Sequence, residues 1–100
     1  MVIVSAKIKT KPGKRDDFIK AAESVIAATR AEAGCLKYEL YASTEDADGL
    51  MYYEEWHSRA ALEEHMKAPH LTAFKKLREE RGLIDGAADV RIFDVSVSGS

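Results

Sequence analysis

Several features are scarce in this 100-residue chain, and each shortage excludes a class of protein. Cys35 is the single cysteine, which excludes an internal disulfide and fits a cytoplasmic location. No apolar stretch is long enough to span a bilayer, and the first residues lack a basic leader, so they predict a strand rather than a signal peptide. We therefore expect one domain over residues 1–100, with a frayed end at Ser98–Gly99–Ser100.

An excess of charge of one sign is also lacking. The chain has 15 Lys and Arg against 17 Asp and Glu, a net charge of −2, and the two signs are interleaved. It therefore has no basic face of the kind that phosphate backbones require, and nucleic acid is not an expected partner. Glycine-rich phosphate loops and the serine turn of hydrolases are missing as well.

The sequence does have clear strand and helix patterns. Residues 2–8 alternate with a period of two, which predicts a strand, and apolar side chains at three- and four-residue steps from 14 to about 32 predict an amphipathic helix. Gly34 is expected to stop this helix in the left-handed conformation. Residues 36–41 and 50–57 predict two strands joined by a short polar turn, and so an antiparallel hairpin.

Two helices and a last strand complete the expected order. Ser58 can cap a short helix over 59–67, and Pro69 suits the first turn of a helix that runs to about Arg81. A strand over 90–97 follows. This order predicts a ferredoxin-like α+β fold, in which helices cover one face of a four-stranded antiparallel sheet.

The other face of such a sheet would lie uncovered. The strands carry more apolar residues than one face can hold, among them Ile3, Tyr41, Met51, Tyr53 and Ile92. An apolar sheet face exposed to water favours a partner. Two such sheets packed face to face would form a homodimer, a dimeric α+β barrel.

Six segments together resemble a known family. They are Lys11-Pro12-Gly13-Lys14, Ala31-Glu32-Ala33-Gly34-Cys35, Tyr38-Glu39-Leu40-Tyr41, Glu54-Glu55-Trp56-His57-Ser58, Leu62-Glu63-Glu64-His65 and Pro69-His70. From first strand to last, the chain resembles the antibiotic biosynthesis monooxygenase domain family, and in particular small bacterial quinol monooxygenases. The resemblance implies a dimer of ferredoxin-like protomers.

The resemblance also implies a range of reactions. These are cofactor-free oxygenation of quinols and aromatic polyketides, oxidative haem degradation, and isomerisation of a small phosphorylated dione. The positions that match the haem-degrading branch are Ala6, His65 and Lys75, and none carries that branch's residue. We therefore expect a monooxygenase that uses dioxygen on a small aromatic or quinol substrate without a cofactor.

The candidate site draws on the third strand and the helix after it. The strand pleat divides the stretch after Met51 into one side with Tyr52, Glu54 and Trp56 and another with Tyr53, Glu55 and His57. If helices cover the first side, His65 stands over the same pocket as Glu54 and Trp56.

A cofactor-free oxygenase needs a base that takes the proton from a phenol or hydroquinone. His65 suits that transfer near neutral pH, and a carboxylate such as Glu54 could orient it, so these two are the candidate catalytic residues. Trp56, Tyr38 and His70 are the candidate substrate contacts.

Structural readings of the same residues stay open. Trp56 and Tyr38 are of a type that often only packs a core, and Glu54 could be anchored by a helix N-terminus or by Arg59. His65 and His70 are five apart, which does not fit the HExxH spacing, and the sequence offers no third ligand beside them, so no metal site is expected.

Two other functions also stay open. An isomerase would use His65 and Glu54 to move a proton without oxygen. A non-catalytic binding or stress-related dimer would have a pocket filled by its own side chains, with no cavity beside His65.

Overall fold

The computed structural model describes residues 1–96, so the expected fraying of 98–100 lies outside the described residues. The elements in chain order are β1 (Val2–Lys9), α1 (Arg15–Arg30), β2 (Cys35–Ala42), β3 (Gly49–Trp56), α2 (Arg59–Lys67), α3 (Pro69–Glu80) and β4 (Asp89–Asp94). The order and type of all seven elements agree with the prediction, and the short helix begins and ends where the sequence placed it. Within the described range, no helix is both long and apolar enough to cross a membrane.

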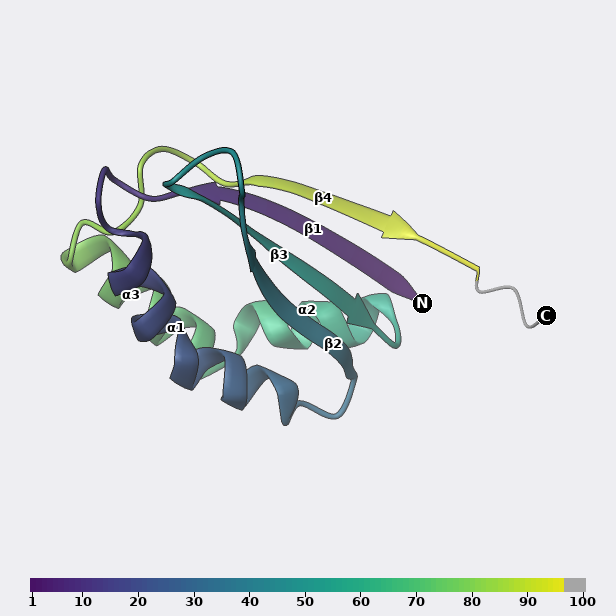
Figure 1. Ribbon diagram of the computed structural model, residues 1–100. Coiled ribbons are helices and arrows are strands. Elements are labelled where there is room, and N and C mark those ends of the chain that lie inside the picture. The colour runs from purple at the N-terminus through teal and green to yellow at the C-terminus, as the bar shows by residue number, and fades with distance from the viewer. Residues whose placement is uncertain (97–100) are drawn as a thin grey trace.

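The four strands form one antiparallel sheet in the order β2-β3-β1-β4. Figure 1 shows the sheet as one layer and the three helices as a second layer on one of its faces, with the other face bare. This confirms the ferredoxin-like α+β fold. Ser58 caps α2 as predicted, because its hydroxyl accepts a hydrogen bond from the Ala61 amide at 3.1 Å.

The core lies between the sheet and the helices. Alternate residues of β1 and β3 point into it, which is the expected period of two. From the helices, Phe18 of α1 and Phe74 of α3 meet edge to face with their ring centroids 5.5 Å apart. The amphipathic stripes of the sequence therefore become one apolar layer under a single sheet face.

Two local expectations are wrong. The predicted strand over 36–41 has Leu36, Tyr38 and Leu40 alternating with polar residues, which would put Leu36 on the same face as Tyr38. Instead, β2 has a bulge between Cys35 and Lys37, and Leu36 is exposed. The bulge shifts the alternation of the strand by one residue. Gly34 was expected to be left-handed, but the described glycines with positive φ are Gly13, Gly82 and Gly86.

Gly34 has a different reason to be glycine. A side-chain carbon at this position would overlap the Cβ atom of Ala61 on α2. His57, just after β3, donates its amide hydrogen to the Gly34 carbonyl at 2.9 Å. The missing side chain therefore lets α2 approach the turn between α1 and β2.

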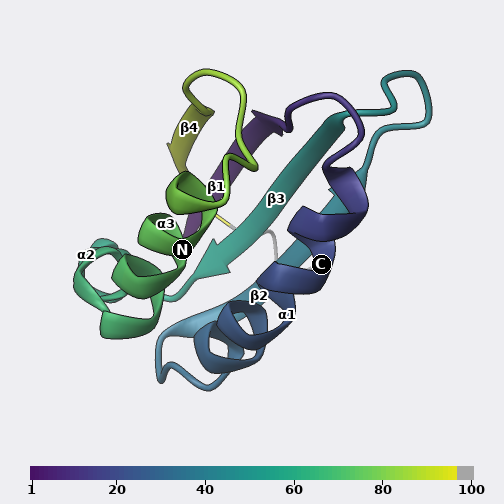
Figure 2. The same ribbon diagram turned by 90° about the vertical axis from the view of Figure 1, so that its left-hand side faces the viewer.

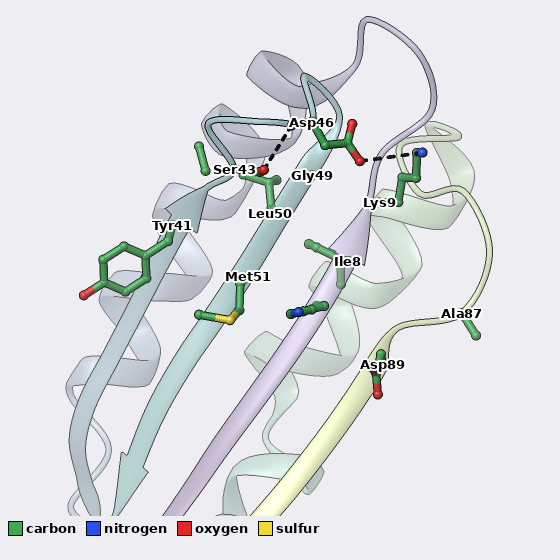
Figure 3. Close-up of a pocket in the computed structure, with 12 residues that line it drawn as sticks. Ile8, Lys9, Tyr41, Ser43, Asp46, Gly49, Leu50, Met51, Ala87 and Asp89 are labelled. Carbon is green, nitrogen blue, oxygen red and sulfur yellow. Dashed lines mark hydrogen bonds and ion pairs between the residues drawn. The ribbon is translucent and has the colours of Figure 1, made fainter.

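The bare face of the sheet carries Ile3, Met51, Tyr53 and Phe93. The register pairs Ile3 with Phe93, so Phe93 points to the bare face, whereas Ile92 pairs with Val4 and points to the helix side. The expectation that counted Ile92 toward an uncovered surface is therefore corrected in favour of Phe93. Near the Ser43–Gly49 turn, a hollow lies beside Tyr41, Met51 and Asp89, and the Lys9–Asp46 ion pair of 3.6 Å borders it (Figure 3).

The contact at Gly34 gives a first prediction. Gly34→Ala should destabilise the fold by about 1–3 kcal/mol, because the added methyl group overlaps Ala61 and α2 must shift. Urea unfolding measures the change. Gly34→Ala should cost much less when Ala61→Gly is already present, and a cycle of the four proteins isolates this coupling. Equal costs of Gly34→Ala in both backgrounds would contradict the proposed overlap.

Candidate functional site

Glu54 and Trp56 lie side by side on β3 under the helices. The Trp56 indole is fully buried, and its Nε1–H donates to Glu54 Oε1 at 2.9 Å. Glu54 is 6% exposed, and burial raises the pKa of its carboxyl from 4.5 to about 7, with the Trp56 hydrogen bond opposing the rise. Arg59, one expected anchor of Glu54, instead pairs with Asp94 at 2.9 Å.

His65, in the last turn of α2, packs against the aromatic rings of the sheet. Its ring centroid lies 4.6 Å from that of Trp56 and 5.5 Å from that of Tyr38, and the residue is 3% exposed. Burial lowers the pKa of His65, while a hydrogen bond to Glu32 opposes the fall. The structure thus brings His65, Glu54, Trp56 and Tyr38 together on the helix side of the sheet.

Glu32 is the residue that sequence reasoning missed. It lies just beyond the end of α1, and its Oε2 is 2.7 Å from His65 Nδ1 and 2.9 Å from His70 Nε2. The carboxylate that orients His65 is therefore Glu32 rather than Glu54. In the sequence, Glu32 is the one acidic residue of Ala31-Glu32-Ala33, just after the first predicted helix. That segment contributed to the family resemblance but was not considered as part of the site.

The contact with Glu32 selects the tautomer of His65. An ionised carboxylate only accepts hydrogen bonds, so the ring nitrogen facing it, Nδ1, carries the proton. In the neutral ring the other nitrogen, Nε2, then keeps its lone pair. His70 likewise donates to Glu32 through Nε2. One carboxylate thus sets the proton positions of two imidazoles.

A row of aromatic rings extends the site into the core. The Tyr38 and Tyr52 ring centroids are 5.2 Å apart, and Tyr52 meets Phe18 at 6.4 Å. Burial raises the pKa of both tyrosines, so both are neutral phenols. The Tyr52 hydroxyl is buried and has no hydrogen-bond partner among residues 1–96, and the same is true of Thr29 Oγ1. Buried hydroxyl groups without a hydrogen-bond partner are rare in folded proteins.

Five hollows of the described surface lie beside other parts of the fold. They are lined without Glu54, Trp56 or His65, and one includes Tyr38 from the strand edge. Solvent reaches the array through Glu32 and His70, whose side chains are 18% and 27% exposed. In a single protomer the array is therefore closely packed.

The third histidine and the single cysteine take no part in the array. His57 is exposed and follows the end of β3, so it does not join the other histidines. Burial raises the pKa of the Cys35 thiol, which keeps it protonated and a poor nucleophile.

The donor atoms of Glu32, His65 and His70 lie within 4.8 Å of one another, close enough to hold a metal ion. The sequence argument that His65 and His70 lack a third ligand is thus corrected, because Glu32 is beside them.

Fold and site together define a one-sided ferredoxin-like domain with a buried histidine, tryptophan and carboxylate array. The family model described as antibiotic biosynthesis monooxygenase matches residues 1–77. The chain belongs to the antibiotic biosynthesis monooxygenase family.

Individual relatives agree with this assignment. A Mycobacterium tuberculosis protein named "Putative monooxygenase Rv0793" is 38% identical over 76 residues, which cover 74% of this chain and 72% of the relative. The solved structure of Rv0793 matches with a TM-score of 0.85 at 30% identity, covering 99% of this chain and 98% of that one.

Two further relatives show the range of names. The Escherichia coli protein "Probable quinol monooxygenase YgiN" is 29% identical over 90 residues, which cover 76% of this chain and 83% of the relative. "Uncharacterized protein sll1783" from Synechocystis is 28% identical over 95 residues, which are 95% of this chain but only 63% of the relative's length.

The buried Glu54 carboxyl predicts a pH effect on stability. Its folded pKa of about 7 lies above the ordinary 4.5, so its contribution is complete below about pH 4.5 and lost as pH rises through about 7. At 1.4 kcal/mol per pKa unit, the loss is at most about 3 kcal/mol. Glu54→Gln keeps an acceptor for Trp56 and should remove this loss. Urea unfolding from pH 5 to 8 measures it, and parallel curves for the two proteins would contradict the prediction.

Proposed function

We propose that the chain is a monooxygenase that oxidises a small aromatic or quinol substrate with dioxygen, without metal or organic cofactor, and that His65 is its base. One observation carries the proposal. His65 is buried against Trp56 while its Nδ1–H is held by Glu32, so a neutral ring presents the Nε2 lone pair for a proton transfer. Glu32 is a positioning residue in this proposal.

The proposed reaction requires a base, because the deprotonated substrate can itself supply electrons to dioxygen. Removal of a phenolic proton by His65 leaves an electron-rich anion that can pass an electron to dioxygen. A hydroquinone and one O₂ then give a hydroxyquinone and one water, so the substrate supplies every electron. The proton taken by His65 returns to the reduced oxygen that leaves as water.

The surroundings of His65 suit a flat substrate. Trp56 and Tyr38 provide aromatic walls. The Tyr52 hydroxyl, which has no partner in the part of the chain that the structure describes, is free to donate to an oxygen of the bound molecule. Glu54, with its pKa of about 7, can exist in either protonation state near neutral pH beside this space. The names of YgiN and Rv0793 support the same class of reaction.

Specific observations favour two other functions. The pKa of Glu54 near neutrality also suits an isomerase, in which His65 and Glu54 move a proton without oxygen. The close packing around His65 is what a non-catalytic dimer would show. Oxygen uptake distinguishes the proposed oxygenase from both.

The proposed base gives a prediction on turnover. His65→Gln should lower hydroquinone-dependent oxygen uptake by about 10²-fold or more, because the amide cannot take the proton. It can still donate to Glu32, so the fold should survive, as thermal unfolding would show. His57→Ala, which changes an exposed histidine outside the array, is the matched control and should keep full activity. Oxygen uptake that is unchanged in His65→Gln would rule out the base.

The assembly is also a proposal. We infer a homodimer through the bare sheet face, because Phe93 is 48% exposed there beside Ile3 and none of the described helices covers either residue. Sedimentation at micromolar concentration should give a dimer. Phe93→Glu should shift it toward the monomer, since a charge would be buried in the interface. Met66→Glu, at an apolar residue of α2 that is 54% exposed, is the control and should stay dimeric. A monomeric native protein would exclude this assembly.

A further inference from the structure

Three side chains of types that often bind metal ions converge on one point from three separate segments. Glu32 comes from the turn after α1, His65 from the last turn of α2, and His70 from the first turn of α3. Figure 2 looks onto the helix layer and shows α2 and α3 meeting at a corner. Both histidines direct a ring nitrogen at the same oxygen, Glu32 Oε2. The two rings therefore share a single acceptor atom.

The donor set has a definite chemical preference. Two imidazole nitrogens and one carboxylate oxygen suit Zn²⁺ and its neighbours in the first transition series, whereas Mg²⁺ and Ca²⁺ prefer oxygen alone. The same two-histidine, one-glutamate combination holds Zn²⁺ in sites that leave a fourth position for water or substrate. Glu32 has His65 and His70 as its ion-pair partners, and no lysine or arginine is paired with it within the described residues.

The three donor atoms would have to move slightly to bind an ion in tetrahedral geometry. Two donors bound to Zn²⁺ at about 2.0–2.1 Å in tetrahedral geometry lie about 3.3 Å apart. The present contacts of 2.7 and 2.9 Å are hydrogen bonds, so each would widen by about half an ångström. The ring nitrogens of His65 and His70, which lie within 4.8 Å of each other, would have to move to the same separation of about 3.3 Å. His70 is only half-buried at the start of its helix, which gives its ring freedom to turn.

We propose that Glu32, His65 and His70 form a site for one divalent transition-metal ion of the Zn²⁺ type. The ion replaces the two hydrogen-bond protons between the rings and the carboxylate. In the neutral rings those protons move to the opposite nitrogens, Nε2 of His65 and Nδ1 of His70. His65 then has no lone pair on Nε2.

Metal binding and the base role therefore exclude each other. This consequence, unlike the site itself, rests on the proposed function, and it makes the ion an inhibitor. A metal bound in this way would reversibly switch off a base that works only when its Nε2 is unprotonated.

The test is direct metal binding to the full chain, which needs no substrate. Titration with Zn²⁺ against a chromophoric chelator, and with Co²⁺ followed by its visible absorption, should show one ion per chain. His70→Ala and Glu32→Gln should each weaken binding at least tenfold, because each removes a ligand. His57→Ala is the matched control and should bind as the native protein does. Circular dichroism checks that each variant is folded.

The outcomes separate the site from the proposed function. No saturable binding, or binding that His70→Ala and Glu32→Gln leave unchanged, overturns the site, as does equal loss in His57→Ala. Oxygen uptake in the presence of a chelator tests the base alone. If uptake persists in chelator, and falls in the native protein over the same range of Zn²⁺ concentration in which the ion binds, the inhibitory role holds; uptake unaffected by bound Zn²⁺ overturns that role.

Discussion

Ionisable side chains that are buried under a sheet must find partners within the layer that buries them, and this constraint organises the site. Water is excluded, so an unpaired charge would cost several kcal/mol. For Glu54, burial raises the pKa of the carboxyl, and the Trp56 indole donates a hydrogen bond to it. For His65, the ring donates a hydrogen bond to Glu32. The two carboxylates thus have different roles because one is deeply buried and the other lies at the edge of the helix layer.

Most of the fold could be predicted from the sequence, because it depends on periodicity and on local stop signals. Ser58 and Pro69 begin their helices through hydrogen bonds and backbone angles that involve only near neighbours. The errors occur where a contact between residues far apart in the sequence determines the local structure. Leu36 is exposed because a bulge shifts the register against β3, and Gly34 is glycine because of Ala61, which lies 27 positions further along the chain.

The site was only half predictable for the same reason. Trp56 and Glu54 follow from the pleat of one strand, and the pleat is a local property. Glu32 is 33 positions from His65, and no pattern in the sequence relates the two. Its partners depend on how the end of α1 meets the corner between α2 and α3, which is a matter of packing between helices.

The break between α2 and α3 explains why spacing was a poor guide to the histidines. On one continuous helix, residues five apart point about 140° away from each other, so His65 and His70 could not share a ligand. Ala68 is extended, with φ −63° and ψ 137°, and Pro69 then starts a new helix in a new direction. The turn brings both rings to Glu32 Oε2. The break at Ala68 and Pro69 therefore lets two histidines that are five positions apart contact the same carboxylate oxygen.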